Sequence, residues 1–354
     1  MSAKVRSEHE IFEDFETLAA SPQFAHAIAF FSFRDNYTGF GEYLRPDDLL
    51  HSNQYEKLIR NEISTLIGVA AKQGKPDIAP EPEQIQTLID KTESLIKELH
   101  TSIAQPMHEI FKTLPKHQPD TDPFDSADVI REPILYGPES AYTFQYLELF
   151  PLKYAQDKQW FQDKFSLSLS EIRHLAESVA TVLSKKLESF RTSALAQSPS
   201  DWNLLNIFTL DAETLSETSS LDLSLVRYFM NHFSTSFADN NTFQNVSDFN
   251  RTNAYPFLKW DDSHFILFQI YTLYEALYET PYFEMISDAR YKDAAAEHRG
   301  DFLEDYSYDK LCNIFGEEHV FKNVIFQDSK RRHLDEADVR NCSAPGARLL
   351  RSSR

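Results

Sequence analysis

Along most of its first 300 residues the chain repeats apolar residues every three or four positions, which is the period of an amphipathic helix. The clearest example is residues 82–113, where isoleucines and leucines from Ile85 to Ile110 fall on one helical face. The same period predicts helices at 8–34, with a break at Ser21-Pro22, and at 54–73, 139–164, 168–197, 221–234 and 283–299. We therefore expect a large helical N-terminal region.

Residues 263–279, SHFILFQIYTLYEALYE, are apolar nearly all round, which predicts a buried helix. Proline lacks a backbone N–H, so Pro281 is expected to end this helix. A stretch with four prolines marks a candidate subdivision of the helical region near 114–138. Turn-forming and polar residues predict loops at 37–50, 114–133 and 238–262.

The pattern changes after Gly300. A predicted helix at 301–316 is followed by HVFKNVIFQ at 319–327, whose β-branched and aromatic residues predict a strand. A polar turn then leads to a second predicted strand at 334–339. The order helix, strand, turn, strand differs from everything before it and places a domain boundary near residue 300.

The expected fold is therefore mainly α, with a short α/β part at its end. We divide the chain into a helical region at 1–299, an incomplete α/β fragment at 300–339 and an atypical tail at 340–354. Composition agrees, because 8 glycines against 28 phenylalanines disfavour the many tight turns of a sandwich or barrel.

Charge is unevenly distributed along the 354 residues, which carry a formal net charge of −20. Residues 319–354 hold eight basic and four acidic residues, whereas residues 1–318 hold 27 and 51. An acidic surface repels phosphate, so the whole surface is not expected to bind nucleic acid. A site for a polyanion is expected only at the C-terminal end.

The chain shows no sign of export or membrane insertion. The first residues lack the apolar core of a signal peptide, and the most apolar stretches are shorter than the roughly 20 residues that span a bilayer. Two cysteines, Cys312 and Cys342, are too few for a disulfide framework or a zinc site. We expect a cytoplasmic protein without a membrane partner.

The candidate chemistry lies in residues 299–339, RGDFLEDYSYDKLCNIFGEEHVFKNVIFQDSKRRHLDEADV. These residues contain a series of short motifs. First come a glycine and a glutamate on a predicted helix, then a leucine and Phe-Gly near the end of that helix. A Val-x-x-Asn-Val strand and the motif Glu-x-Asp-Val follow. The corresponding residues are Gly300, Glu304, Leu311, Phe315-Gly316, Val320 to Val324 and Glu336-Ala337-Asp338-Val339. This order resembles the nuclease-related (NERD-like) branch of the PD-(D/E)xK restriction-endonuclease-like superfamily, in bacterial proteins with a large helical region before that domain.

The resemblance implies hydrolysis of phosphodiesters with Mg²⁺ as cofactor. Glu304 on the helix and Asp338 at the strand would be the metal ligands and the catalytic acids, because Mg²⁺ prefers hard carboxylate oxygens. The basic run of Lys330, Arg331 and Arg332 would contact the phosphates of a nucleic acid.

One element of the family pattern is missing from this chain. The family places Glu/Gln-x-Lys on the next strand, whereas the residues after Val339 read RNCSAPGARLLRSSR and contain no Lys, Glu, Gln or Asp. We expect a frameshifted or truncated tail, and a nuclease that is inactive or impaired as given.

Simpler interpretations exist for each of these residues. Glu304 alone would be an ordinary solvated charge, and Asp338 would pair with Arg331 or Arg332 at the surface, which contributes about 0–1 kcal/mol. The alternative function is a non-enzymatic helical protein that binds a protein partner through the apolar surfaces of 263–283 and the loop 238–262. An unpaired strand edge would also favour a homodimer.

Three further features have structural explanations beside functional ones. His264 is expected to be a packed or capping residue at a helix start rather than a metal ligand. The aromatic stripe through 265–278 is expected to be core rather than a base-stacking surface. Asp248, Asn250 and Asn253 would bind a metal or a partner, or serve as turn residues.

Overall fold

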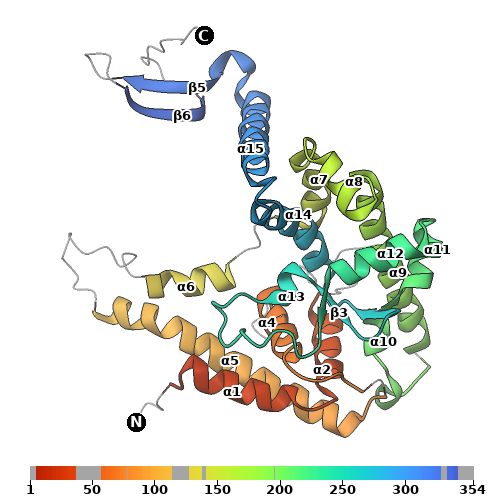
Figure 1. Cartoon of the computed structure of the whole chain (residues 1–354). Helices are drawn as coiled ribbons and strands as arrows, with labels where there is room; N and C mark the ends of the chain where they lie inside the picture. Colours follow the sequence, from red (N-terminus) through yellow and green to blue (C-terminus); the bar gives the residue numbers. More distant parts are fainter. Residues whose placement is uncertain are drawn as a thin grey trace.

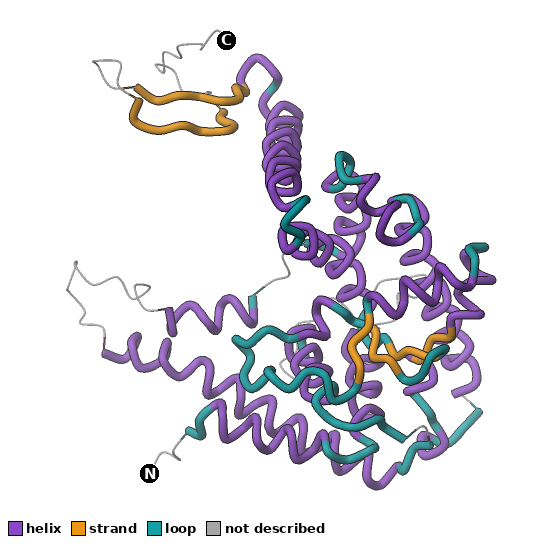
Figure 2. Tube along the Cα trace, viewed as in Figure 1, coloured by secondary structure: helices purple, strands orange, loops and turns teal. Residues whose placement is uncertain are grey.

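Helices dominate the structure (Figure 1, Figure 2), a computed structural model that describes residues 5–36, 57–77, 79–113, 127–137, 141–194, 196–327 and 333–341. Strands contribute two small sheets. The predicted mainly α fold class is confirmed. Among the described helices, none is long and apolar enough to cross a membrane.

The first half of the described chain holds only helices. They are α1 (Glu8–Ala19), α2 (Phe24–Phe31), the π-helical turn η1 (Ser32–Asn36), α4 (Arg60–Ala70), α5 (Pro82–Thr113), α6 (Ala127–Tyr136), α7 (Thr143–Lys153), α8 (Lys158–Phe165) and α9 (Leu169–Ala194). The bounds of α5 and α9 follow the apolar periodicity closely.

The second half alternates short helices with strands before two long helices. Its elements up to residue 266 are η3 (Pro199–Asp201), α10 (Leu205–Phe208), β1 (Thr209–Asp211), α11 (Ala212–Ser219), α12 (Leu223–His232), β2 (Ser234–Ser236), α13 (Arg251–Ala254), β3 (Phe257–Lys259) and β4 (His264–Ile266). The remaining elements are α14 (Ile270–Ser287), α15 (Lys292–Phe315), η4 (Glu317–His319), β5 (Val320–Gln327) and β6 (His333–Asn341).

Four three-residue strands form a sheet in the middle of the molecule. Their order is β1-β4-β3-β2, with β4 antiparallel to both β1 and β3, and β2 parallel to β3. The expectation that residues 1–299 are all helical is therefore wrong in this part. Strands of three residues are too short to show a two-residue period in the sequence.

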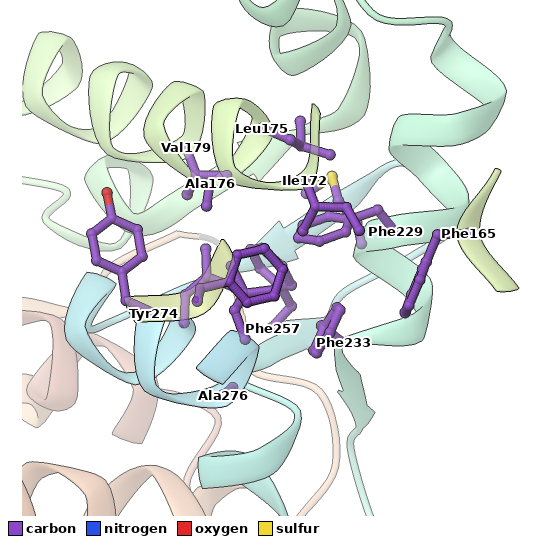
Figure 3. Packing of buried hydrophobic residues seen from close by; sticks show 14 of the residues in the cluster. Phe165, Ile172, Leu175, Ala176, Val179, Phe229, Phe233, Phe257, Tyr274 and Ala276 are labelled. Atoms are coloured by element: carbon purple, nitrogen blue, oxygen red, sulfur yellow. The ribbon is translucent and has the colours of Figure 1, made fainter. Parts of the chain in front are cut away.

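The two faces of this sheet belong to two different hydrophobic cores. Successive strand residues point to opposite faces. Accordingly, Phe257 and Phe265 join the central core of α7, α8, α9, α11, α12 and α14, whereas Leu258 and Ile266 join the N-terminal core of α1, α2, α4, α5 and α10. Figure 3 shows the central core, with side chains of α9 packed over Phe257.

The segment predicted as one helix at 263–279 contains both a strand and a helix. His264–Ile266 form β4, and the helix α14 begins only at Ile270. The predicted burial of the segment is confirmed, because Phe265, Phe268 and Tyr274 are each at most 6% exposed. An apolar run of this kind does not by itself distinguish a buried strand from a buried helix.

Pro281 lies inside α14 and does not end it, contrary to the prediction. Side chains at the end of α7 bind the backbone groups of α14 on either side of the proline. Tyr282 N–H donates to Tyr154 Oη at 3.1 Å, and that hydroxyl donates to Tyr278 O at 2.7 Å. Lys153 Nζ donates to the same carbonyl. Because these side chains occupy the polar groups on both sides of the proline, the helix continues to Ser287.

We call residues 292–341, the last described part of the chain, the terminal element. Its helix α15 runs away from the rest of the molecule, and the antiparallel hairpin β5–β6 lies at its far end (Figure 1). The strand predicted at 319–327 is confirmed by β5. Residue 300 lies inside the continuous helix α15, so no break in secondary structure marks the domain boundary near 300, which stays a prediction together with the subdivision near 114–138.

Candidate functional site

Glu304 lies half-buried on α15 and contacts the hairpin. Its Oε1 accepts a hydrogen bond from Asn323 Nδ2 at 3.2 Å. Asn323 is exposed on β5 and has a φ of 54°, a left-handed conformation that asparagine adopts more readily than most residues. Glu304 is thus tied to the hairpin through a residue with a special backbone conformation.

Asp338 lies across the hairpin from that asparagine. The register pairs Val339 with Lys322 and Ala337 with Val324, which leaves positions 338 and 323 facing one another between these pairs. The side chain of Asp338 lies outside the described part of the structure. The backbone nevertheless brings position 338 next to the residue that binds Glu304.

Lys322 of β5, which no motif in the sequence specifies, contacts the same helix as Glu304. Lys322 Nζ pairs with Asp305, the residue after Glu304, and lies 4.8 Å from the centre of the Tyr308 ring. The ion pair partly neutralises the negative charge of α15 at this point. The position of Lys322 depends on which helix packs against β5, and no motif in the sequence indicates that packing.

The described residues offer a divalent cation only part of a binding site. Glu304 contributes one carboxylate, a hard ligand that Mg²⁺ accepts, and its Oε1 already accepts a hydrogen bond from the Asn323 amide. No group of three or more His, Cys, Asp or Glu side chains that could hold a metal occurs within the described ranges. The set fits a cation held by one or two carboxylates that keeps several waters. The predicted phosphate contacts Lys330, Arg331 and Arg332 lie outside the described residues.

Polar contacts hold the start of α15 against the loop between α7 and α8. The buried carboxylate of Asp157 accepts hydrogen bonds from Tyr291 Oη and His298 Nδ1, both at 2.7 Å, and Gln156 Nε2 donates to Asp301 at 3.2 Å. Burial, together with the Asp157 carboxylate, raises the pKa of Tyr291 above its ordinary value. These contacts fix the direction in which α15 leaves the body and therefore where Glu304 lies.

The asparagine-rich loop packs against α4. Asn250 Nδ2 donates to Ser64 O at 2.9 Å, and Ser64 Oγ donates to Asn253 Oδ1. Asp248 accepts the N–H groups of the two residues Gln244 and Asn245, at 2.8 and 3.0 Å. The interpretation of these residues as turn and packing residues accounts for their contacts.

The structure corrects the expected position of His264 and shows where the apolar residues of 263–283 lie. His264 begins a strand, not a helix, and its Nδ1 lies 2.9 Å from Asp261 Oδ1 at the surface. The apolar residues of 263–283, which the alternative function offers to a protein partner, are mostly buried in the two cores. Phe283, at 58% exposure, is the large apolar residue of that range that the structure exposes.

Comparison with known proteins adds no relative to this description. The chain matches no protein-family model, no curated protein and no solved structure.

Proposed function

We propose that the terminal element is derived from a metal-dependent nuclease, in which Glu304 and Asp338 are a pair of divalent-cation ligands. The observation that carries the proposal is the hydrogen bond from Asn323 to Glu304, because Asn323 lies across the hairpin from Asp338. The order of a helix and an antiparallel hairpin over 292–341 also agrees with the opening of a PD-(D/E)xK fold.

The residues of this chain suit binding of a cation better than hydrolysis. A bound Mg²⁺ would polarise a phosphate and lower the pKa of its water. Beside it, Lys322 is engaged by Asp305, and the sequence after Asp338 contains no lysine to offset transition-state charge. We therefore infer weak binding of Mg²⁺ or Mn²⁺, and slow or absent cleavage of nucleic acid.

The alternative of a helical protein-interaction role has less support. The apolar side chains that it requires between residues 263 and 283 are occupied by intramolecular packing. The hairpin, by contrast, leaves the carboxylate of Glu304 within reach of solvent.

Titration of Mn²⁺ into the full chain, followed by electron paramagnetic resonance, tests the proposal. We expect Glu304→Ala and Asp338→Asn each to weaken binding about tenfold or more, since each removes a charged ligand. Glu297→Ala is the matched control, because Glu297 is an exposed glutamate two turns earlier on the same helix. Equal Mn²⁺ affinity in all four proteins would overturn the proposal.

The same proteins are then incubated with single-stranded and duplex DNA and with RNA in the presence of Mg²⁺ or Mn²⁺. Little or no cleavage is expected. Rapid cleavage that disappears in Glu304→Ala would support the two ligands and contradict the expected inactivity. Cleavage that persists in both ligand variants would indicate a contaminating nuclease.

A further inference from the structure

A cavity of about 210 Å³ lies between α4, α5, α6 and the loop before α13. It is remote from the terminal element, and its walls come from four segments far apart in the sequence. A cavity of ~150 Å³ holds benzene, so this one has room for a ligand of about six to ten non-hydrogen atoms. Its lining is part apolar, with Leu99, Ile103 and Phe243, and part polar.

Hydrogen bonds hold the polar walls in place. Asn61 Nδ2 donates to Leu135 O at 2.7 Å and joins α4 to α6. On the opposite side of the cavity, Asn250 packs against α4. Only a glycine fits at position 68 of this helix, because a Cβ on Gly68 would lie 2.6 Å from Asn250 Nδ2. These close contacts attach the loop to α4, and the cavity is preformed.

Among the described lining residues, the charged side chains of the cavity are all acidic. Glu62 and Asp248 line it, together with the Tyr136 hydroxyl and several amides, whereas no lysine, arginine or histidine is among the described lining residues. The Glu62 side chain belongs to a residue that is only 9% exposed, and among the described residues its carboxylate accepts one hydrogen bond, from Ile59 N–H at 2.9 Å. A carboxylate has room for about four such bonds, so the described contacts leave acceptor capacity on Glu62, which lines the cavity.

We propose that this cavity binds a small organic ammonium ion, with Glu62 as its main ionic partner and Leu99, Ile103 and Phe243 around its apolar part. The two carboxylates repel an anion, and among the described lining residues no cationic side chain offsets them. A neutral apolar molecule would leave the buried carboxylate without compensation. An N–H donor cation satisfies both the charge and the remaining acceptors.

The electrostatic state of Glu62 agrees with this proposal. Burial raises the pKa of Glu62 to about 7, and the Asp35 carboxylate nearby adds to the effect. Burial and the carboxyl groups of Glu62, Glu132 and Glu8 also raise the pKa of Tyr136 above its ordinary value, which keeps that hydroxyl neutral. A cation bound between these groups would favour the charged carboxylate.

Calorimetric titration of the full chain with 2-phenylethylammonium at pH 8 tests the proposal. We expect saturable binding, and binding of the neutral isostere 2-phenylethanol that is about tenfold weaker or undetectable. Glu62→Gln should weaken binding of the amine by about tenfold or more while keeping the bond from Ile59 N–H, which a glutamine accepts as well.

Two further variants make the result independent of folding defects. Ile134 lines the mouth and is 67% exposed, so Ile134→Lys adds a competing cation without disturbing the core and should also weaken binding. Glu188→Gln, an exposed glutamate of α9, should bind like the original chain. Equal binding of the alcohol and the amine, unchanged binding in Glu62→Gln, or no binding of the amine would overturn the proposal.

Discussion

The helical body and the terminal element differ most in how much apolar surface each buries. The body encloses two cores, separated by a sheet whose strands give alternate residues to each. Within the described part of the terminal element, the buried apolar residues are Ala295, Val320 and Val324. A two-stranded hairpin is marginally stable alone and depends on packing against a helix, here α15. Leu303, Ile314 and Phe315 of α15 are each exposed by 40% or more, so the described part of the terminal element buries few of its apolar side chains, whereas the body encloses two cores.

The difference also separates two kinds of candidate site. Glu304 lies on an exposed helix next to water, where a cation would keep part of its hydration. Glu62 is a buried residue that lines a partly open cavity of the body, and its charge is costly unless a partner compensates it. The first site lies on a helix with few buried apolar residues among those described, and the second is lined in part by residues of the N-terminal core.

The largest expected effect comes from the sheet between the two cores. Phe265→Ala removes a fully buried ring and should lower the free energy of unfolding by about 3–5 kcal/mol, measured with urea. In the hairpin, Val324→Ala should change the same global value by less than about 1 kcal/mol, because local opening precedes global unfolding. A comparable loss in both variants would mean that body and terminal element unfold as one unit.

The second effect depends on pH and concerns the polar part of the body. The pKa of Glu62 is about 7 in the folded protein and about 4.5 for an ordinary glutamate in water, so the folded state holds this proton more tightly. Its contribution to stability is complete below pH 4.5 and is lost as the pH rises through 7. Glu62→Gln should therefore be more stable than the original chain by up to about 3 kcal/mol at pH 8, and similar near pH 4. A difference that stays constant with pH would contradict the buried carboxylate.

A smaller effect is expected where Pro281 interrupts α14. Tyr154→Phe removes the hydroxyl that bridges Tyr282 N–H and Tyr278 O, which leaves a buried donor without this partner. The expected loss is about 2 kcal/mol of unfolding free energy. Tyr228→Phe, at a half-exposed tyrosine of α12, should change the value by less than about 0.5 kcal/mol. Equal losses would show that the bridge does not support the helix.

These positions also show what the sequence alone could predict. Strong periodicity over many residues located α5 and α9, and β-branched residues located β5. Three-residue strands and a helix that continues through Pro281 depend on partners elsewhere in the chain, such as Tyr154. Glu62 looks like any helical glutamate, because its environment includes residues far away in the chain, such as Asp35 and Tyr136.

The candidate site of the terminal element was predictable only as a set of motif residues. Their order indicated Glu304 and Asp338, and the hairpin register brings position 338 opposite Asn323. The bond between Asn323 and Glu304, and the pair of Lys322 with Asp305, follow from the way α15 covers the hairpin. No local pattern encodes that packing.

The smallest effect is the sharpest test of the separation between the two regions. Asn323→Gly removes the bond to Glu304 but accepts a φ of 54° freely, whereas Asn323→Ala removes the same bond and adds a strain of about 1 kcal/mol. Hydrogen exchange should show the amides of β5 less protected in both variants, and more so with alanine. Global unfolding should stay within about 0.5 kcal/mol of the original in both. If alanine lowers global stability by its full strain, the hairpin belongs to the cooperative unit of the body, and the terminal element is not an independently opening region.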